Sequence, residues 1–464
     1  MPARGNANPT GLRRRYEHHN KGSLLSIQNI LFVALVVLGL IYYRVSVYLL
    51  QGGSTAAKGT VHNHRPLDTQ YIHELQEQGL LLPSKTLNTY QEWRDYATQL
   101  ASLTPEKIVK TLKLLDPFGV RTFEAKLLEA ESEKKAFLTQ EELRSIFPCP
   151  TSSTTQQQEQ QQQQRITLPD QRNSDKGRAF RNGTEPNFLF FQHLRKAGGT
   201  NFCSLAQHNL PKKQVPKYYC MPDYYWEAPG RPCAGCFSRF DTKTITKHMK
   251  EDGHKILGNE WDAFDPDHYF DLPATFATSF RRPLDRALSQ FRFECIEDRG
   301  CKIKNVTKWW DKRSKDLTNV YVWTFSNEGV RKLSIGTTKA DSERRQKVLG
   351  RALDVVARFN LVMAMEWLAY APNHVQRVLG FRDTKTLTER VRPHIAQHKR
   401  DDGQERNVMG AAGIAKASWT PENYLPPETY TRMSHDLALD EILTDAARRM
   451  FLERLVCDDV SMFD

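Results

Sequence analysis

An apolar run that leads into a pair of glycines is the sequence feature that most constrains the fold. Residues 187–205 read NFLFFQHLRKAGGTNFCSL, with a continuous apolar stretch at Phe188–Phe191 and Gly198-Gly199 directly before a helix-like run. A short, continuous apolar run is typical of a buried parallel strand. Glycines let the backbone turn tightly around an anion, and the free N–H groups of a helix start point at it. The segment therefore predicts a strand, an anion-binding turn and a helix in succession.

The order of the residues separates this turn from a nucleotide-triphosphate loop. The motif GxxxxGK[ST] places its Lys after the glycines, whereas Lys196 precedes them here. A Gly-Gly-Thr sequence also occurs as an ordinary turn followed by a helix N-cap at Thr200. A second part of the site has to distinguish the two interpretations.

A second junction of this kind follows further along the chain. The apolar residues Ala274–Phe280 lead into Arg281, Arg282 and Pro283, and a proline suits the first position of a helix. Arg281 at the strand end and Ser289 two helical turns later can bind one phosphate through a guanidinium fork and a hydroxyl. An arginine-rich turn by itself is often only a solvated surface. Two such junctions about 80 residues apart favour a shared anion site.

At these residues the chain resembles the Golgi carbohydrate sulfotransferases, in particular the heparan sulfate 2-O- and 6-O-sulfotransferases. RKAGGTNF is similar to the loop with which that family binds the 5′-phosphosulfate of its donor, 3′-phosphoadenosine 5′-phosphosulfate (PAPS). RRPLDRALS is similar to its 3′-phosphate segment. Weaker likenesses at 359–367 and 436–455 extend the resemblance over about 187–464. Arg195, Ala197 and Arg282 depart from the residues that are common in the family.

The resemblance implies a fold and a set of donor-binding residues. The apolar strands that lead into helix starts indicate an α/β fold, and the resemblance adds a P-loop-like, mainly parallel sheet flanked by helices. Lys196 is expected to stabilise charge on the leaving phosphate, and no metal ion is required. The implied donor-binding residues are Arg195, Lys196, Ala197, Gly198, Gly199, Thr200, Asn201, Arg281 and Ser289.

The acceptor hydroxyl needs a general base, and two residues between the junctions are candidates for this catalytic role. Glu260 follows the apolar pair Ile256-Leu257, and His254 stands at the start of that run. The heparan sulfate enzymes that the chain resembles use a His in this region, whereas tyrosylprotein sulfotransferases use a Glu. The choice between Glu260 and His254 therefore stays open.

Three further residues each allow two interpretations, one functional and one structural. Glu366 stands at the end of an expected strand, where it is either catalytic or a structural partner of an arginine. Trp309 and Trp310 are adjacent in a basic stretch, where they either stack on a sugar ring or pack in the core.

Residues 24–43 predict a membrane anchor. This stretch has about 20 residues and contains an unbroken apolar run from Ile30. It is long enough to cross a bilayer. Arg13, Arg14, Arg15 and Lys21 precede it, which favours a cytoplasmic N-terminus. We expect a single-pass type II protein of the Golgi membrane, with a cytoplasmic tail at 1–23 and the rest in the lumen. A cleaved signal peptide is the alternative.

All eight cysteines follow this segment, which is typical of an oxidising compartment. Cys295 and Cys301 form the easiest local bridge, and the other pairings stay open. Cys233 and Cys236 form a CxxC motif, but a second CxxC is absent from the sequence. Disulfides are therefore favoured over zinc.

Residues 44–148 are expected to form a lumenal helical stem. Helices are predicted at Tyr90–Leu103, Thr104–Leu115 and Thr139–Phe147, and the last opens with a Thr139/Glu142 capping box. The stem serves either as a spacer or to join copies of the chain into a homo-oligomer. Residues 149–186 contain TSSTTQQQEQQQQQ and read as a low-complexity linker before a catalytic domain at 187–464.

The charge of the chain bears on its partners. A net charge of +12 suits an acidic polysaccharide, although it also fits a generally basic surface. The chain has no nucleic-acid-binding motif, so a nucleic-acid partner is not expected. We expect PAPS-dependent transfer of a sulfuryl group to a hydroxyl of a glycan or glycoconjugate. The alternatives are a nucleotide kinase, a tyrosylprotein-type sulfotransferase and a catalytically inactive, membrane-anchored glycan-binding protein.

Overall fold

The computed structural model describes residues 74–83, 87–134, 136–147, 149, 188–217, 219–222, 240–260, 262–265, 274–297, 301–327, 338–388 and 420–457. These residues all belong to one compact unit, 69–464. The expected membrane anchor at 24–43, residues 150–186 of the expected linker, and Cys233 and Cys236 lie outside the described residues. Among the described residues, no helix has the length and apolar character that a membrane crossing requires.

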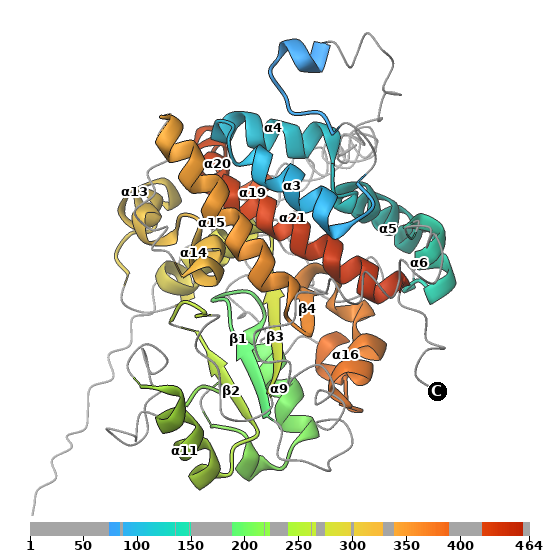
Figure 1. Ribbon diagram of the computed structural model, residues 1–464, viewed down its shortest axis with the longest axis vertical. Coiled ribbons are helices and arrows are strands. Elements are labelled where there is room, and N and C mark those ends of the chain that lie inside the picture. The colour runs from blue at the N-terminus through green and yellow to red at the C-terminus, as the bar shows by residue number, and fades with distance from the viewer. Residues whose placement is uncertain are drawn as a thin grey trace, which may run out of the picture. The chain divides into compact units, whose positions relative to one another are not determined.

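A parallel sheet stands at the centre of this unit (Figure 1). Its strands are β1 (Phe188–Gln192), β2 (Ile256–Asn259), β3 (Ala274–Phe280) and β4 (Leu361–Ala364). Their order is β2-β1-β3-β4, and each of the three pairings is parallel. Every residue of the four strands is buried, because helices cover both faces, which explains the continuous apolar runs. The α/β class with a parallel sheet flanked by helices is confirmed.

The strand order places a reversal of direction between β1 and β3. From β1 the chain passes to β2 on one side and then returns to β3 on the other side. Open α/β sheets form ligand crevices outside the carboxyl ends of the strands at such a reversal. The helices that begin there are α9 (Gly199–Asn209), after β1, and α12 (Pro283–Phe291), after β3. Pro283 occupies the first position of α12, as expected.

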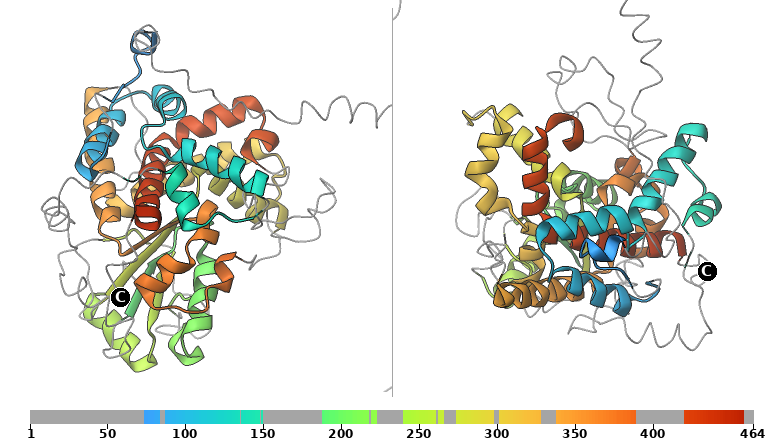
Figure 2. Two further views of the ribbon diagram at one scale, coloured as in Figure 1. Left: turned by 90° about the vertical axis from the view of Figure 1, so that its right-hand side faces the viewer. Right: turned by 90° about the horizontal axis from the view of Figure 1, so that it is seen from above.

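The helices that precede the sheet pack against helices from the C-terminal half (Figures 1 and 2). Helix α3 (Tyr90–Leu100) contacts α15 (Lys339–Ala357), and α4 (Pro105–Leu115) contacts α21 (Ala438–Leu452). Their apolar side chains belong to the same hydrophobic core as the strands. Helices expected in the stem therefore pack against helices of the expected catalytic region.

Local signals explain where these helices begin. Helix α6 (Gln140–Ile146) opens with the expected Thr139/Glu142 capping box, in which each residue caps the backbone N–H of the other. Thr104 caps α4 in front of Pro105. Helix α5 (Val120–Lys134), between them, was not predicted.

Buried ion pairs join α5 to α21. Arg448 is 1% exposed, and its Nη2 lies 2.8 Å from Oε2 of Glu124. Nη2 of Arg121 lies 2.9 Å from Oδ2 of Asp445. Removing one partner of such a pair leaves a buried charge without compensation, which is strongly destabilising. These contacts therefore fix how α5 sits on α21.

A second, smaller core lies under α12. Trp309 and Trp310 are each 1% exposed, and their indole N–H groups donate to Glu294 at 2.9 Å and to Asp436 at 2.7 Å. The pair is therefore packed in a core and offers no surface to a sugar ring. Among the described residues, the remaining helices of eight or more residues are α11 (Thr242–Asp252), α13 (Val306–Leu317), α16 (Pro372–Leu379) and α20 (Pro427–Asp436).

Three disulfides lie among the described residues. The expected Cys295–Cys301 bridge is confirmed, and the others are Cys203–Cys220 and Cys149–Cys457. Cys149–Cys457 joins residues 308 positions apart and ties the end of the N-terminal helices to the segment after α21.

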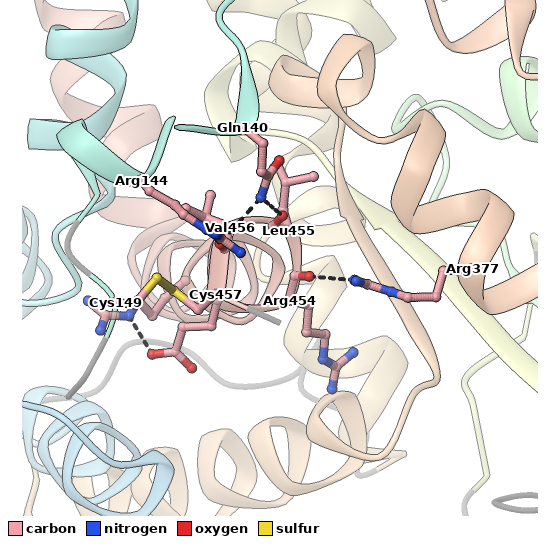
Figure 3. Close-up of a disulfide and its surroundings, with 10 residues drawn as sticks. Gln140, Arg144, Cys149, Arg377, Arg454, Leu455, Val456 and Cys457 are labelled. Atoms are coloured by element: carbon pink, nitrogen blue, oxygen red, sulfur yellow. Dashed lines mark hydrogen bonds and ion pairs between the residues drawn. A yellow bond between two sulfur atoms is a disulfide. The ribbon is translucent and has the colours of Figure 1, made fainter. Parts of the chain in front are cut away.

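Side chains around Cys149–Cys457 cap that last segment (Figure 3). Gln140 donates to the carbonyl of Leu455 at 2.7 Å, and Arg144 donates to the carbonyl of Val456 at 3.0 Å. Arg377 donates to the carbonyl of Arg454 at 2.8 Å. Carbonyls at a helix end have no partner within the helix, so these donors satisfy them.

The length of the loop that each disulfide closes predicts its effect on stability. The Cys149→Ser/Cys457→Ser variant should lose about 3 kcal/mol more free energy of unfolding than Cys295→Ser/Cys301→Ser, because the cost of closing a loop grows with its length. The two bridges span 308 and 6 positions. Urea unfolding of both variants checks this, and equal losses would contradict it.

A buried histidine in α16 predicts a loss of stability in acid. His374 is 3% exposed, and burial, together with the charges of Arg377 and Arg454, lowers its pKa to about 3. A lowered pKa in the folded state gives stability that is present above pH 6.5 and is lost as the pH falls toward 3. Between pH 7.5 and pH 5 this residue should cost the protein about 2 kcal/mol.

Replacement of His374 tests this. The His374→Gln variant should have a smaller fall in unfolding free energy between pH 7.5 and pH 5, measured in urea. Its stability at pH 7.5 separates any packing defect from the effect of protonation. Parallel pH profiles for the two proteins would show that His374 does not titrate as expected.

Candidate functional site

The turn between β1 and α9 has the backbone geometry of an anion site. Lys196 and Gly198 both have left-handed backbone conformations, with φ of 66° and 97°. Gly198 is the N-cap of α9 and provides no side-chain cap. The first hydrogen bond of α9 runs from the N–H of Phe202 to the carbonyl of Gly198, at 3.0 Å. The N–H groups of Gly199, Thr200 and Asn201 therefore have no acceptor within α9, and the positive end of its dipole lies here.

Lys196 is held in a strained conformation by its surroundings. The left-handed conformation costs roughly 1–2 kcal/mol in a residue that has a side chain. Arg281 Nη1 donates to the carbonyl of Lys196 at 3.3 Å, and Ala197 N–H donates to the carbonyl of Leu194 at 3.0 Å. The Lys196 ammonium lies 4.2 Å from the centre of the Phe293 ring. Lys196 is thus held at its backbone and at its charged end.

The structure brings the two junctions together at one edge of the sheet. Besides Arg281, two residues of β3 reach the first turn: Ser279 Oγ donates to the carbonyl of Ala197, and Thr278 Oγ1 donates to the carbonyl of Gln192 at 3.0 Å. These partners are 82 and 86 positions apart in the sequence. The strand end of the second junction therefore supports the glycine turn of the first.

The second arginine of this junction has a structural role. The Arg282 guanidinium donates to Asp285 at 2.8 Å and lies 4.0 Å from Glu124. Its backbone N–H donates to Glu366 Oε1 at 2.9 Å. Glu366 follows β4 and accepts this bond at the N-cap of α12, which favours the structural interpretation of that residue.

The remaining residues of the second junction lie in or against α12. Ser289 is 8% exposed, near the end of this helix. Arg286 is buried, and its Nη2 donates to the carbonyl of Leu317 at 3.0 Å, so it is a core residue. The hydroxyl of Tyr321 donates to the carbonyl of Arg281 at 2.9 Å. Sequence reasoning missed Tyr321, because it comes from α14 (Val320–Ser326), which no local signal connects to Arg281.

Glu260 lies at the same edge of the sheet as the glycine turn. It follows β2 directly, and its carboxylate lies 3.8 Å from Arg195 Nε and 3.9 Å from His193 Nδ1. Between the ends of β1 and β2, Gln192 Nε2 donates to the backbone carbonyl of Asn259 and Asn259 Nδ2 donates to Gln192 Oε1, each at 3.1 Å. The carboxylate of Glu260 is thus held beside the turn that carries Lys196.

His254 lies at the opposite edge of the sheet. It precedes β2, its backbone N–H donates to Met249, and its Nδ1 lies 3.7 Å from Asp252. Glu260 follows His254 by six residues, with β2 between them, about 20 Å at the rise of an extended strand. The structure therefore brings Glu260, and not His254, to the edge that carries Lys196.

Packing requires a glycine at position 199, which the sequence did not reveal. A Cβ atom at this position would lie 1.7 Å from Nε2 of His193. The imidazole of His193 is packed against the first residue of α9, so no side chain fits there. Asn201, two residues later, donates to the carbonyl of Thr386 at 3.3 Å and so helps to anchor α9.

Within the described residues, no group of three or more His, Cys, Asp or Glu side chains is arranged to hold a metal ion. The site consists instead of cationic side chains, a helix start and one carboxylate. Fold and site together define an α/β protein with a glycine turn and an uncapped helix start at the carboxyl end of its parallel sheet. Comparison with family models, curated proteins and solved structures finds no match for the chain. The resemblance to sulfotransferases therefore stays a prediction.

The contact between His193 and Gly199 predicts a specific coupling. Gly199→Ala should destabilise the protein by about 2 kcal/mol or more, because the new methyl group overlaps the imidazole. His193→Ala removes the imidazole, so the double variant should recover much of that loss. The free energies of unfolding of the two single variants and the double variant measure the coupling. Additive losses would contradict the expected overlap.

Gly253→Ala provides the control. Unlike Gly199, Gly253 has a positive φ, 67°, and nothing lies within 4 Å of a Cβ at that position. This variant should show backbone strain of about 1 kcal/mol and no coupling to His193.

Proposed function

We propose that the chain is a PAPS-dependent sulfotransferase that transfers a sulfuryl group to a hydroxyl of a glycan or glycoconjugate in the Golgi lumen. The observation that carries this proposal is the contact between the Arg281 guanidinium and the Lys196 carbonyl. It joins two cationic junctions at the reversal between β1 and β3. A nucleotide with phosphate groups at both its 5′ and 3′ positions needs two anion sites in one crevice.

The residues of the site suit such a donor. The uncapped start of α9 offers N–H groups from Gly199 and Thr200 to a phosphosulfate, and Lys196 adds a charge. Arg281 and Ser289 would bind the 3′-phosphate. When bound, the donor supplies an activated sulfuryl group.

The chain contributes mainly position and charge. Phe293 and the strained backbone keep the Lys196 ammonium at the turn, where it stabilises negative charge on the leaving phosphate. Fixed groups of this kind need little reorganisation during the reaction, and orientation lowers the barrier further. In phosphoryl transfer, likewise, positioning and electrostatics supply most of the rate enhancement.

Glu260 is the general base in this proposal. The acceptor oxygen forms a bond to sulfur as the bond from sulfur to the bridging phosphate oxygen breaks, and the hydroxyl proton passes to the Glu260 carboxylate. Arg195 and His193, both within 4 Å of this carboxylate, keep it oriented. His254 would take no part, because it lies at the other edge of the sheet.

The setting of the proposed reaction rests on the rest of the chain. The three disulfides suit an oxidising lumen, and the net charge of +12 suits an acidic acceptor. The type II anchor at 24–43 and its Golgi location belong to the same proposal.

Transfer from labelled PAPS tests the proposal. The panel contains an acidic polysaccharide, a neutral glycan and a tyrosine peptide. Lys196→Ala and Glu260→Gln should each lower kcat about 100-fold or more, through lost charge stabilisation and lost proton transfer. His254→Gln should keep the normal rate. Lys213→Ala, at an exposed cation after α9, is the matched control for Lys196→Ala.

Thermal unfolding of each variant checks that the fold is retained. A normal rate in Lys196→Ala would contradict the role of the turn, and a lost rate in His254→Gln would reassign the base. Transfer to the tyrosine peptide alone would change the acceptor class. Failure of the purified protein to bind 3′-phosphoadenosine 5′-phosphate would favour an inactive glycan-binding protein.

A further inference from the structure

An Asn-Val-Thr sequence at 305–307 stands on the surface at the start of α13. It has the N-x-[ST] pattern of an acceptor for N-linked glycans, with a residue other than proline in the middle. Asn305 is exposed, at the end of the short irregular segment that follows the Cys295–Cys301 bridge. This pattern is expected on a surface loop of a secreted protein, and the structure places Asn305 in such a position.

The side-chain amide of Asn305 uses one of its two polar atoms. Asn305 is the N-cap of α13, and its Oδ1 accepts the N–H of Lys308 at 3.0 Å. An amide nitrogen cannot accept a hydrogen bond, so this contact fixes how the amide is turned and directs Nδ2 away from the helix start. Among the described residues, Nδ2 has no acceptor. A group attached to Nδ2 would therefore leave the helix cap intact.

We propose that Asn305 carries an N-linked glycan. The bond that forms joins Nδ2 to the anomeric carbon of an oligosaccharide, and the bond that breaks joins this carbon to an oxygen of a lipid pyrophosphate. The lipid pyrophosphate leaves with the electron pair, and a proton of Nδ2 passes to a base of the transferase. The inference rests on the lumenal placement in the proposed function, because the lipid-linked donor and its transferase act in the lumen.

The threonine of this sequence has a partner in the folded protein. Thr307 Oγ1 lies 2.7 Å from Oγ1 of Thr429, a residue of α20 that is 3% exposed. This partner comes 122 positions later in the chain. At roughly 5–20 residues per second, synthesis leaves about 6 s or more before α20 exists. The Thr307 hydroxyl is thus accessible to a transferase that acts on the growing chain, and the contact with Thr429 forms afterwards.

The surroundings of Asn305 leave room for a large group. Lys302, Lys304 and Lys308, the nearest charged residues in the sequence, are all exposed. An N-linked glycan is bulky and keeps the surface around it in water. A homo-oligomer of the glycosylated protein would therefore have to form through another part of the chain.

Cell-free translation of the full-length chain with microsomes tests the proposal. The sequence has a second N-x-[ST] pattern at Asn182, outside the described residues, so every variant is made in an Asn182→Gln background. This parent chain should gain one glycan, seen as a shift in gel mobility that peptide N-glycosidase removes. Asn305→Asp should lose the shift completely, although its carboxylate can still cap α13.

Two sets of matched variants sharpen the result. Thr307→Ser keeps the hydroxyl that the pattern requires and should keep the shift, whereas Thr307→Val should lose it. Asn319→Asp is the control for Asn305→Asp, because Asn319 is also a helix N-cap but stands outside any N-x-[ST] pattern. This control should keep the shift.

Protection of the chain from added protease shows separately whether it has entered the lumen. A protected parent chain without the shift would overturn this proposal alone, and so would a shift that persists in Asn305→Asp. A chain that the protease digests completely would overturn the lumenal placement and this proposal with it. Neither measurement uses PAPS, so a lack of sulfotransferase activity would leave the glycosylation of Asn305 standing.

Discussion

The parallel pairing of β1 with β3 is the constraint on which the candidate site depends. Because the two strands run in the same direction, both end at one edge of the sheet. Their register sets Gln192 opposite Thr278, so the turn with Lys196 and the residues around Arg281 emerge side by side. The contacts of Ser279 and Arg281 with the carbonyls of the turn follow from this register. Without this register, each of the two junctions would be only an ordinary turn.

The N-terminal helices complete this arrangement instead of standing apart from it. Arg448 of α21 and Arg282 at the start of α12 both lie beside Glu124 of α5. Buried charges are costly without partners, so α5, α12 and α21 depend on one another. The bridge between Cys149 and Cys457 ties the segment after α6 to the segment after α21 covalently. The region that read as a stem therefore helps to hold the start of α12, where Arg281 is presented.

Some residues of the site were recognisable in the sequence and others were not. Lys196, Gly198 and Arg281 stand in short segments whose composition predicts a strand, a turn and a helix. His193 and Tyr321 carry no such signal, because their partners Gly199 and Arg281 are brought to them by packing.

The sequence by itself determined the local elements: the buried strands, the proline start of α12, the Thr139/Glu142 cap and the short Cys295–Cys301 bridge. These depend on residues within a few positions of one another, so propensity and spacing suffice. The tertiary structure decided that Glu260, and not His254, shares an edge with Lys196, and that the N-terminal helices join the core of the sheet. Strand direction, register and packing between distant segments set those relations, and no local pattern encodes them.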